Sequence, residues 1–148
     1  MVGRLARYLR IVGCDTAYAR GISDEEILSL ARREERILVT RDRALSERAP
    51  GAVLLTSPRI EEQWRTVRAA HPEVPCEVSF ERCTACNGRL VAYAPAPGDT
   101  ASGNVPWDRV REGLQLFRCA DCAHIYWEGT HTASIRSRLH RWAEVGSS

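Results

Sequence analysis

Residues 83–88 read CTACNG, and residues 119–122 repeat the pattern as CADC, so two Cys-x-x-Cys pairs lie 32 residues apart. In a chain without a secretory signal, this spacing predicts a metal site rather than disulfide bonds. Each turn can present two thiolates, and two turns complete the tetrahedral shell of structural zinc. The predicted ligands are Cys83, Cys86, Cys119 and Cys122. An iron–sulfur cluster and a redox-active dithiol are the alternatives.

The segments around these turns are typical of a zinc ribbon. Asn87 and Gly88 follow the first pair and suit the positive φ of a tight turn. The predicted strands are EVSFERC (77–83), LQLFRC (114–119) and HIYWEG (124–129). Residues 94–106 contain three prolines and two glycines and predict a loop. We assign residues 76–148 to a zinc ribbon that ends in a helix over about 133–145.

Residues 1–75 show a different pattern, in which helical periodicity alternates with short apolar runs. The predicted strands are CDTAYA (14–19), RILVT (36–40) and AVLLT (52–56). The predicted helices cover about 2–12, 24–35, 44–48 and 58–71, and Ser23 with Glu26 forms a capping box. Strands that alternate with helices imply βαβ units, so we predict an α/β domain with a parallel sheet over residues 1–75.

Composition excludes several classes of protein. The 148 residues include 21 basic and 19 acidic side chains, all of the basic ones are arginine, and neither half is a polycation. Any nucleic-acid site is therefore a local patch, although guanidinium groups suit phosphate contacts well. No apolar run approaches the length of a membrane helix, and Arg4, Arg7 and Arg10 interrupt any N-terminal signal sequence. We expect a cytoplasmic protein.

Acidic side chains occur at two equivalent places in the predicted α/β domain. Asp42 follows the strand that is predicted to end at Thr40. Asp24 and Glu25 lie in the first turn of the helix predicted over about 24–35, just before that strand. One interpretation is structural, because acids commonly cap helices and interact favourably with the helix dipole. The other is a site at the carboxyl ends of the strands, where converging carboxylates would hold Mg²⁺ or Mn²⁺ for phosphodiester hydrolysis.

Several motifs in this order resemble one known family. They are GRLARYLRIVGCDT (3–16), SDEEIL (23–28), ILVTRD (37–42), the two Cys pairs and YWEGTH (126–131). The chain resembles, over roughly residues 1–142, the PIN-like ribonucleases with a C-terminal zinc ribbon, named after the C-terminal domain of the mut-seven exonuclease. The resemblance implies an α/β nuclease core that gathers acidic residues around a divalent metal and cleaves RNA. On matching positions it implies Asp42 as a metal ligand, with Asp24 or Glu25 as the second.

The chain departs from the resembled pattern at its start. Relatives of this kind begin with an apolar strand that ends in an aspartate, just before the segment matching MVGRLA (1–6). We therefore expect the sheet to lack one strand and the acidic cluster to lack one carboxylate. The elements next to the absent strand would have uncovered apolar faces, so we expect the fold to be marginally stable. An upstream coding segment, a second copy of the chain or a partner protein would supply the missing strand.

The predicted function is metal-dependent cleavage of RNA. The predicted RNA contacts are Arg4, Arg7, Arg41, Arg43 and His131, for which solvated helix faces and a structural histidine are the alternatives. The competing hypothesis is a zinc-ribbon protein that binds RNA without cleaving it, and an oxidoreductase that uses the Cys pairs is a third.

Overall fold

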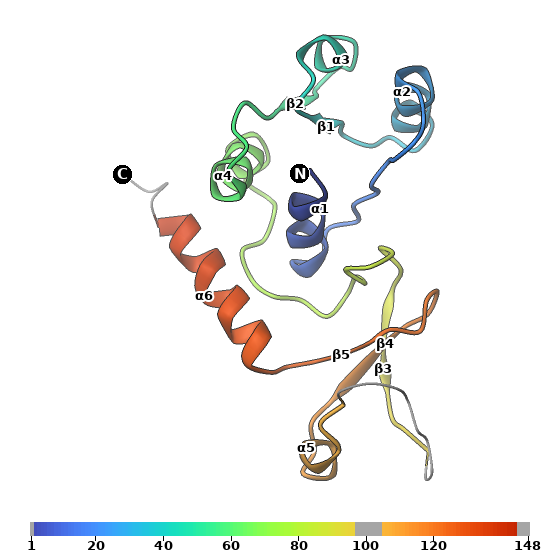
Figure 1. Cartoon of the computed structure of the whole chain (residues 1–148), viewed down its shortest axis with the longest axis vertical. Helices are drawn as coiled ribbons and strands as arrows, with labels where there is room; N and C mark the ends of the chain where they lie inside the picture. The colour runs from blue at the N-terminus through green and yellow to red at the C-terminus, as the bar shows by residue number, and fades with distance from the viewer. Residues whose placement is uncertain (1, 97–104, 145–148) are drawn as a thin grey trace.

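Short parallel strands and helices form the first half of the chain (Figure 1). The structure is a computed structural model that describes residues 2–96 and 105–144. The elements of this half are α1 (Val2–Ile11), α2 (Asp24–Arg33), β1 (Val39–Thr40), α3 (Arg43–Glu47), β2 (Val53–Leu54) and α4 (Ile60–Ala70). β1 and β2 pair in parallel, with Val39 opposite Val53, so the predicted mixed α/β class with a parallel sheet is confirmed.

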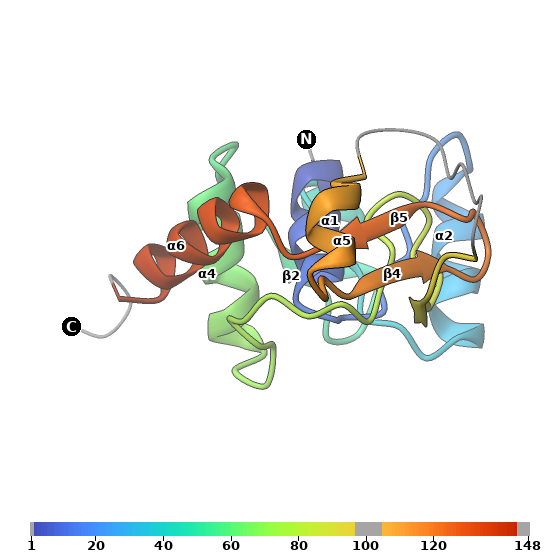
Figure 2. The same cartoon turned by 90° about the horizontal axis from the view of Figure 1, so that it is seen from below.

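The second half contains an antiparallel sheet and the C-terminal helix (Figure 2). Its elements are β3 (Leu90–Tyr93), α5 (Trp107–Arg111), β4 (Leu116–Cys119), β5 (Ile125–Trp127) and α6 (Thr130–Glu144). The sheet order is β3-β4-β5, with Leu90 opposite Cys119. Most of the loop predicted over 94–106 lies outside the described residues.

Two predicted strands are not formed. Residues 14–19 are irregular because side chains take their hydrogen bonds: the Thr16 amide donates to Asn87 Oδ1, and the Thr16 carbonyl accepts from Arg10 Nε, both at 2.9 Å. In segment 77–83, the Ser79 amide donates to the Ile11 carbonyl, and Arg82 makes only an isolated bridge. In both segments, the backbone is satisfied by contacts that do not belong to a sheet ladder.

The main core joins the two ends of the chain. Side chains of α1, β2, α4 and α6 form one buried cluster, and the rings of Tyr8 and Trp142 lie 5.0 Å apart at its centre. Figure 1 shows α6 beside α4 rather than beside the antiparallel sheet. The division of the chain near residue 75 remains a prediction, but α6 packs with the first half.

A groove of about 800 Å³ lies between α1, α2 and β1. Its apolar wall includes Leu5, Leu9, Leu30 and Val39. Leu38 and Thr40 accept hydrogen bonds from β2, so the backbone of the intervening Val39 faces away from β2. The apolar groove therefore lies beside an edge of β1 that no described strand pairs with.

Within residues 2–96 and 105–144, no helix combines the length and the apolar character that crossing a bilayer requires.

Trp64 provides a test of the core. Its side chain is fully buried, and its Nε1 hydrogen has no partner among the described residues. Trp64→Ala is expected to lower the free energy of unfolding by about 3–5 kcal/mol, because it leaves a large cavity. Trp64→Phe retains an aromatic ring and removes the unsatisfied donor, so we expect a loss of less than about 2 kcal/mol. Urea denaturation measures both, and equal losses would contradict this description of the site.

Candidate metal centre and acidic site

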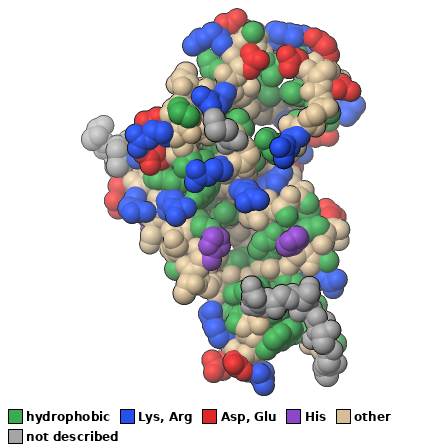
Figure 3. Space-filling model, in the orientation of Figure 1, with side chains coloured by type: hydrophobic (Ala, Val, Ile, Leu, Met, Phe, Trp, Pro, Cys, Tyr) green, Lys and Arg blue, Asp and Glu red, His purple; other side chains and the backbone are tan. Residues whose placement is uncertain are grey.

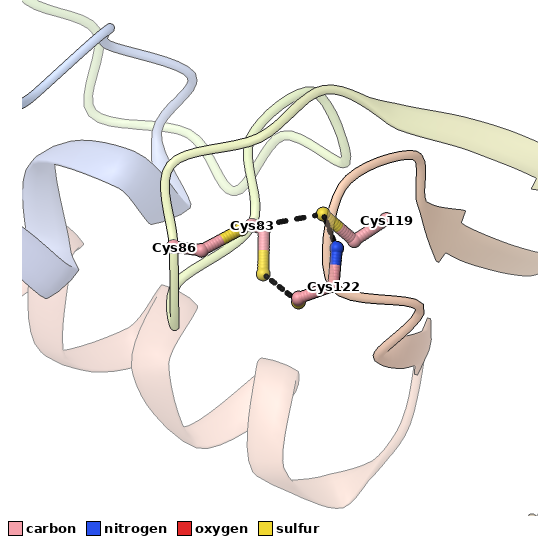
Figure 4. A group of neighbouring side chains, drawn as sticks. All are labelled: Cys83, Cys86, Cys119 and Cys122. Atoms are coloured by element: carbon pink, nitrogen blue, oxygen red, sulfur yellow. Dashed lines mark hydrogen bonds between the residues drawn. The ribbon is translucent and has the colours of Figure 1, made fainter.

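The Cys83–Cys86 turn and the turn after β4 bring the four cysteines together (Figure 4). All four sulfur atoms lie within 4.8 Å of one another, with Cys83 and Cys122 Sγ 3.5 Å apart. A tetrahedral ion with Zn–S bonds of about 2.3 Å needs sulfur separations of about 3.8 Å. The thiol groups therefore fit a metal ion such as zinc. Among the residues that the structure describes, this is the only group of three or more metal-ligating side chains at such separations.

Unusual backbone geometry shapes both turns. Asn87 follows the first pair with φ 69°, and Ala123 follows the second with φ 67°. Gly88 does not have the positive φ that the sequence predicted, and glycine is required here for another reason. A Cβ atom at this position would lie 2.7 Å from Cys119 Sγ, so any side chain would collide with the cluster. The sequence CNG therefore combines a left-handed residue with a close approach of backbone to sulfur.

Mutual proximity shifts the pKa values of the Cys86 and Cys119 thiols in opposite directions. Burial raises the pKa of Cys119, but hydrogen bonds from the amides of Cys122 and Asp121 outweigh it and hold this pKa at about 7. For Cys86, the Gly88 amide lowers the pKa, whereas desolvation and the other thiols raise it to about 12. Four thiolates cannot coexist here without a positive ion to neutralise them.

Tyr126 supports the cluster, a role that the sequence analysis did not identify. Its hydroxyl group lies 3.0 Å from Cys83 Sγ and 3.2 Å from Thr84 Oγ1. Burial and the neighbouring Cys83 raise the pKa of Tyr126 to about 12, so the phenol remains protonated. The signal available in the sequence was its position four residues after Cys122, on the strand that leaves the second turn.

Hydrogen bonds attach the first cysteine turn to the end of α1. Arg10 is only 8% exposed, and its guanidinium donates to the Thr84 carbonyl at 2.9 Å. Asn87 donates to Asp15 Oδ1 at 2.7 Å while its own Oδ1 accepts from the Thr16 amide. Arg10 is therefore structural, unlike Arg4 and Arg7, which are exposed on the same helix.

The predicted acidic residues lie at the starts of α2 and α3. Asp42 is the N-cap of α3, and its Oδ1 accepts from the Leu45 amide at 3.0 Å. Glu25 accepts from Arg48 at 2.6 Å, and Asp24 also raises the pKa of Arg48, to a smaller extent than Glu25. Arg48 thus links the end of α3 to the start of α2. The three carboxylates do not form a common ligand set within 4.8 Å.

The predicted RNA contacts occupy two places. Arg41 and Arg43 flank Asp42 and are exposed, without an ion pair to any described residue. Arg4 and Arg7 lie on the exposed face of α1, and His131 is exposed in the first turn of α6. The structure therefore separates a pair of cations beside Asp42 from a group on α1 and α6.

The metal centre leads to a prediction about composition. The purified chain is expected to contain one zinc ion per molecule, and Cys86→Ser should lose most of it because three thiolates bind more weakly than four. Cys76→Ser is the matched control and should retain full zinc, since Cys76 lies outside the cluster. Elemental analysis of the purified proteins measures both. Iron in place of zinc, or full zinc in Cys86→Ser, would contradict the assignment.

Asp15 leads to a prediction about pH. Hydrogen bonds from Asn87 and Arg36 lower the pKa of this carboxyl below 3.8. A lowered native pKa stabilises the fold above the unfolded-state value, and this contribution disappears as the pH falls through the native value. Asp15→Asn should therefore be less stable than the parent at pH 7, and the difference should shrink below roughly pH 5. Thermal unfolding of both proteins across this range measures it, with Asp108→Asn as the control. A constant difference would count against the ion pair.

Comparison with known proteins bears on these residues. Searches among curated proteins and among solved structures found no match. The sequence model of the Mut7-C RNAse domain matches residues 1–139, which include the acidic positions and both cysteine turns. This match confirms the resemblance drawn from the motifs, and it indicates a ribonuclease-related function. The chain belongs to the Mut7-C RNAse domain family.

Proposed function

We propose that this protein hydrolyses phosphodiester bonds of RNA with a divalent metal ion, Mg²⁺ or Mn²⁺, held by Asp42 and by Asp24 or Glu25. The observation that carries the proposal is the match to an RNAse domain over residues 1–139. The exposed carboxylates at the starts of α2 and α3 support it, because they are hard oxygen ligands within one family-matched region.

Asp42 retains the capacity to bind a metal while it caps α3. Its Oδ1 accepts from the Leu45 amide, and its Oδ2 has no hydrogen-bond partner among the described residues. The amide of Asp42 donates to Thr40 Oγ1, which fixes the residue directly after β1. The cap thus orients the carboxylate without using both oxygens.

The second ligand requires a rearrangement at Arg48. Glu25 is 74% exposed in its side chain and engaged by this arginine, whereas Asp24 accepts no hydrogen bond from a described side chain. Release of Glu25 from such an exposed pair requires little free energy, because exposed ion pairs contribute only about 0–1 kcal/mol to stability. Either acid would have to move toward Asp42, because the three carboxylates do not form a ligand set within 4.8 Å as they stand.

The bound metal would supply charge stabilisation and an activated water for phosphoryl chemistry. Arg41 and Arg43 would orient the substrate, because guanidinium groups bind phosphate oxygens in a bidentate manner. The four-cysteine cluster would hold structural zinc, since a closed four-sulfur shell leaves no open coordination position. Its contribution would be to the fold of the ribbon and to the position of α1.

A second candidate function is RNA binding without cleavage. The observation that favours it is the current use of the acids: Asp42 caps a helix, Glu25 pairs with Arg48, and the carboxylates do not converge. In this case the acids would be structural, and the arginines would account for the whole interaction with RNA. The two candidates differ in one measurable property, metal-dependent product formation.

Asp42→Asn separates the candidates. Asparagine caps helices as well as aspartate does, so the variant should fold normally. It lacks the charge that holds the metal, so we expect cleavage of a labelled single-stranded RNA with Mn²⁺ to fall by about a hundredfold or more. The assay should compare added Mn²⁺ with buffer lacking divalent metal. Chelators are unsuitable, because they would also remove zinc from the cysteines.

The matched control is Asp108→Asn, which changes an equally charged residue in the first turn of α5. It should cleave at the parental rate. Asp24→Asn and Glu25→Gln, measured in parallel, identify the second ligand as the one whose loss slows cleavage. A parent that binds RNA but forms no product with Mn²⁺ would establish the non-catalytic candidate instead.

A further inference from the structure

We propose that single-stranded RNA binds across the exposed face of α1, with its phosphates on arginines of α1 and α6 and a base stacked on Tyr18. The choice of RNA as the ligand rests on the proposed function. The location, the residues of α6 and the role of Tyr18 come from the contacts of the fold.

The solvent face of α1 is entirely basic or neutral. Arg4 and Arg7 are three residues apart and exposed, so they are neighbours on one face of the helix. α1 contains no acidic residue, and neither arginine has an ion pair with a described residue. These cations are therefore available for phosphate groups.

α6 extends this basic surface. Arg138 donates to the hydroxyl group of Tyr8, a buried residue of α1 one turn after Arg4, so Arg138 lies at the flank of α1 that borders Arg4. Arg141 follows one turn later, and His131 precedes Arg138 by about two turns on the same side of α6. From His131 to Arg141 the ridge is about 15 Å long.

The opposite flank of α6 is different. Arg136 pairs with Glu128 at 2.6 Å, and His140 lies 2.6 Å from Glu77. These groups are neutralised within the protein, whereas the flank that adjoins α1 has no such acidic partner among the described residues. Figure 3 shows arginines across the region of α1, α4 and α6, with acidic side chains mainly around α2 and α3.

Tyr18 borders the other side of the α1 face. This residue is 41% exposed, whereas the other three tyrosines are buried or half-buried. The ring rests on Gly3 of α1, where an added Cβ would lie 3.3 Å from it, and Arg20 lies 5.8 Å from its centroid. An exposed ring that rests on the helix, with the Arg20 guanidinium over it, is suited to stacking with an unpaired base.

The combination favours a single strand over other polyanions. A duplex presents phosphates but keeps its bases stacked, and an anionic membrane has no flat aromatic group to stack on Tyr18. A single strand offers both phosphates and free bases to this surface. The predicted contacts are Arg4, Arg7, Arg138, Arg141 and His131 for the backbone, and Tyr18 for a base.

Fluorescence anisotropy with a labelled 12-nucleotide RNA tests the proposal, in an Asp42→Asn background that prevents cleavage. The test variant carries Arg4→Gln, Arg7→Gln and Arg141→Gln. Each phosphate contact on a single strand contributes about 0.7 to the slope of log Kd against log salt concentration. Losing three should lower this slope by about 2. The control carries Arg32→Gln, Arg33→Gln and Arg111→Gln, which remove equal charge from α2 and α5.

Tyr18 provides a second, independent readout. Tyr18→Ala should weaken binding about tenfold, whereas Tyr18→Phe should bind like the parent because it keeps the ring. An RNA duplex of equal length and vesicles containing phosphatidylserine should bind more weakly than the single strand. Equal affinity for the duplex or the vesicles, or equal slopes in the two arginine variants, would overturn the proposal.

Failure of this proposal is distinguishable from failure of the proposed function. Loss of binding in the α1–α6 variant stands whether or not the parent cleaves RNA, because binding is measured without catalysis. Conversely, a parent that cleaves RNA while the arginine and Tyr18 variants bind normally would keep the nuclease and reject this surface.

Discussion

The attachment of the Cys83–Cys86 turn to the end of α1 is the contact on which both halves of the chain depend. Arg10 is buried and donates to the Thr84 carbonyl, and Asn87 exchanges hydrogen bonds with Asp15 and Thr16. The four sulfurs lie close enough together to hold a metal ion such as zinc, and a bound cation would neutralise their thiolates. A metal ion held there would therefore stabilise the ribbon and, through Asn87, the irregular segment that carries Tyr18.

The hydrophobic core makes a second connection between the halves. Trp142 of α6 packs on Tyr8 and Trp64, so the last helix completes the core around α1 and α4. This packing places one flank of α6 against α1 and leaves the other facing Glu77 and Glu128. A purely apolar contact thus decides which arginines stay free and which are neutralised. The proposed RNA surface is a consequence of that choice.

The acidic residues illustrate how a position with a role in the fold could also serve the chemistry of the proposed function. A residue that caps a helix directly after a strand is held at the carboxyl end of the sheet, where ligands bind in open α/β folds. Asp42 uses one oxygen for the cap, and its other oxygen has no hydrogen-bond partner among the described residues. The apolar groove beside β1 shows that the small sheet leaves an edge and a cavity uncovered.

Sequence alone determined the features that depend on local spacing. The cysteine pairs, the capping box at Ser23 and the helical periodicities each involve residues a few positions apart, and the structure confirms them. Tertiary structure alone decided what depends on distant partners. Residues 14–19 had the pattern of a strand but bond to Asn87 and Arg10, and the three arginines of α1 looked alike until packing buried Arg10. Periodicity records which side of an element is apolar, but it does not record which neighbour will satisfy a backbone amide or neutralise a charge.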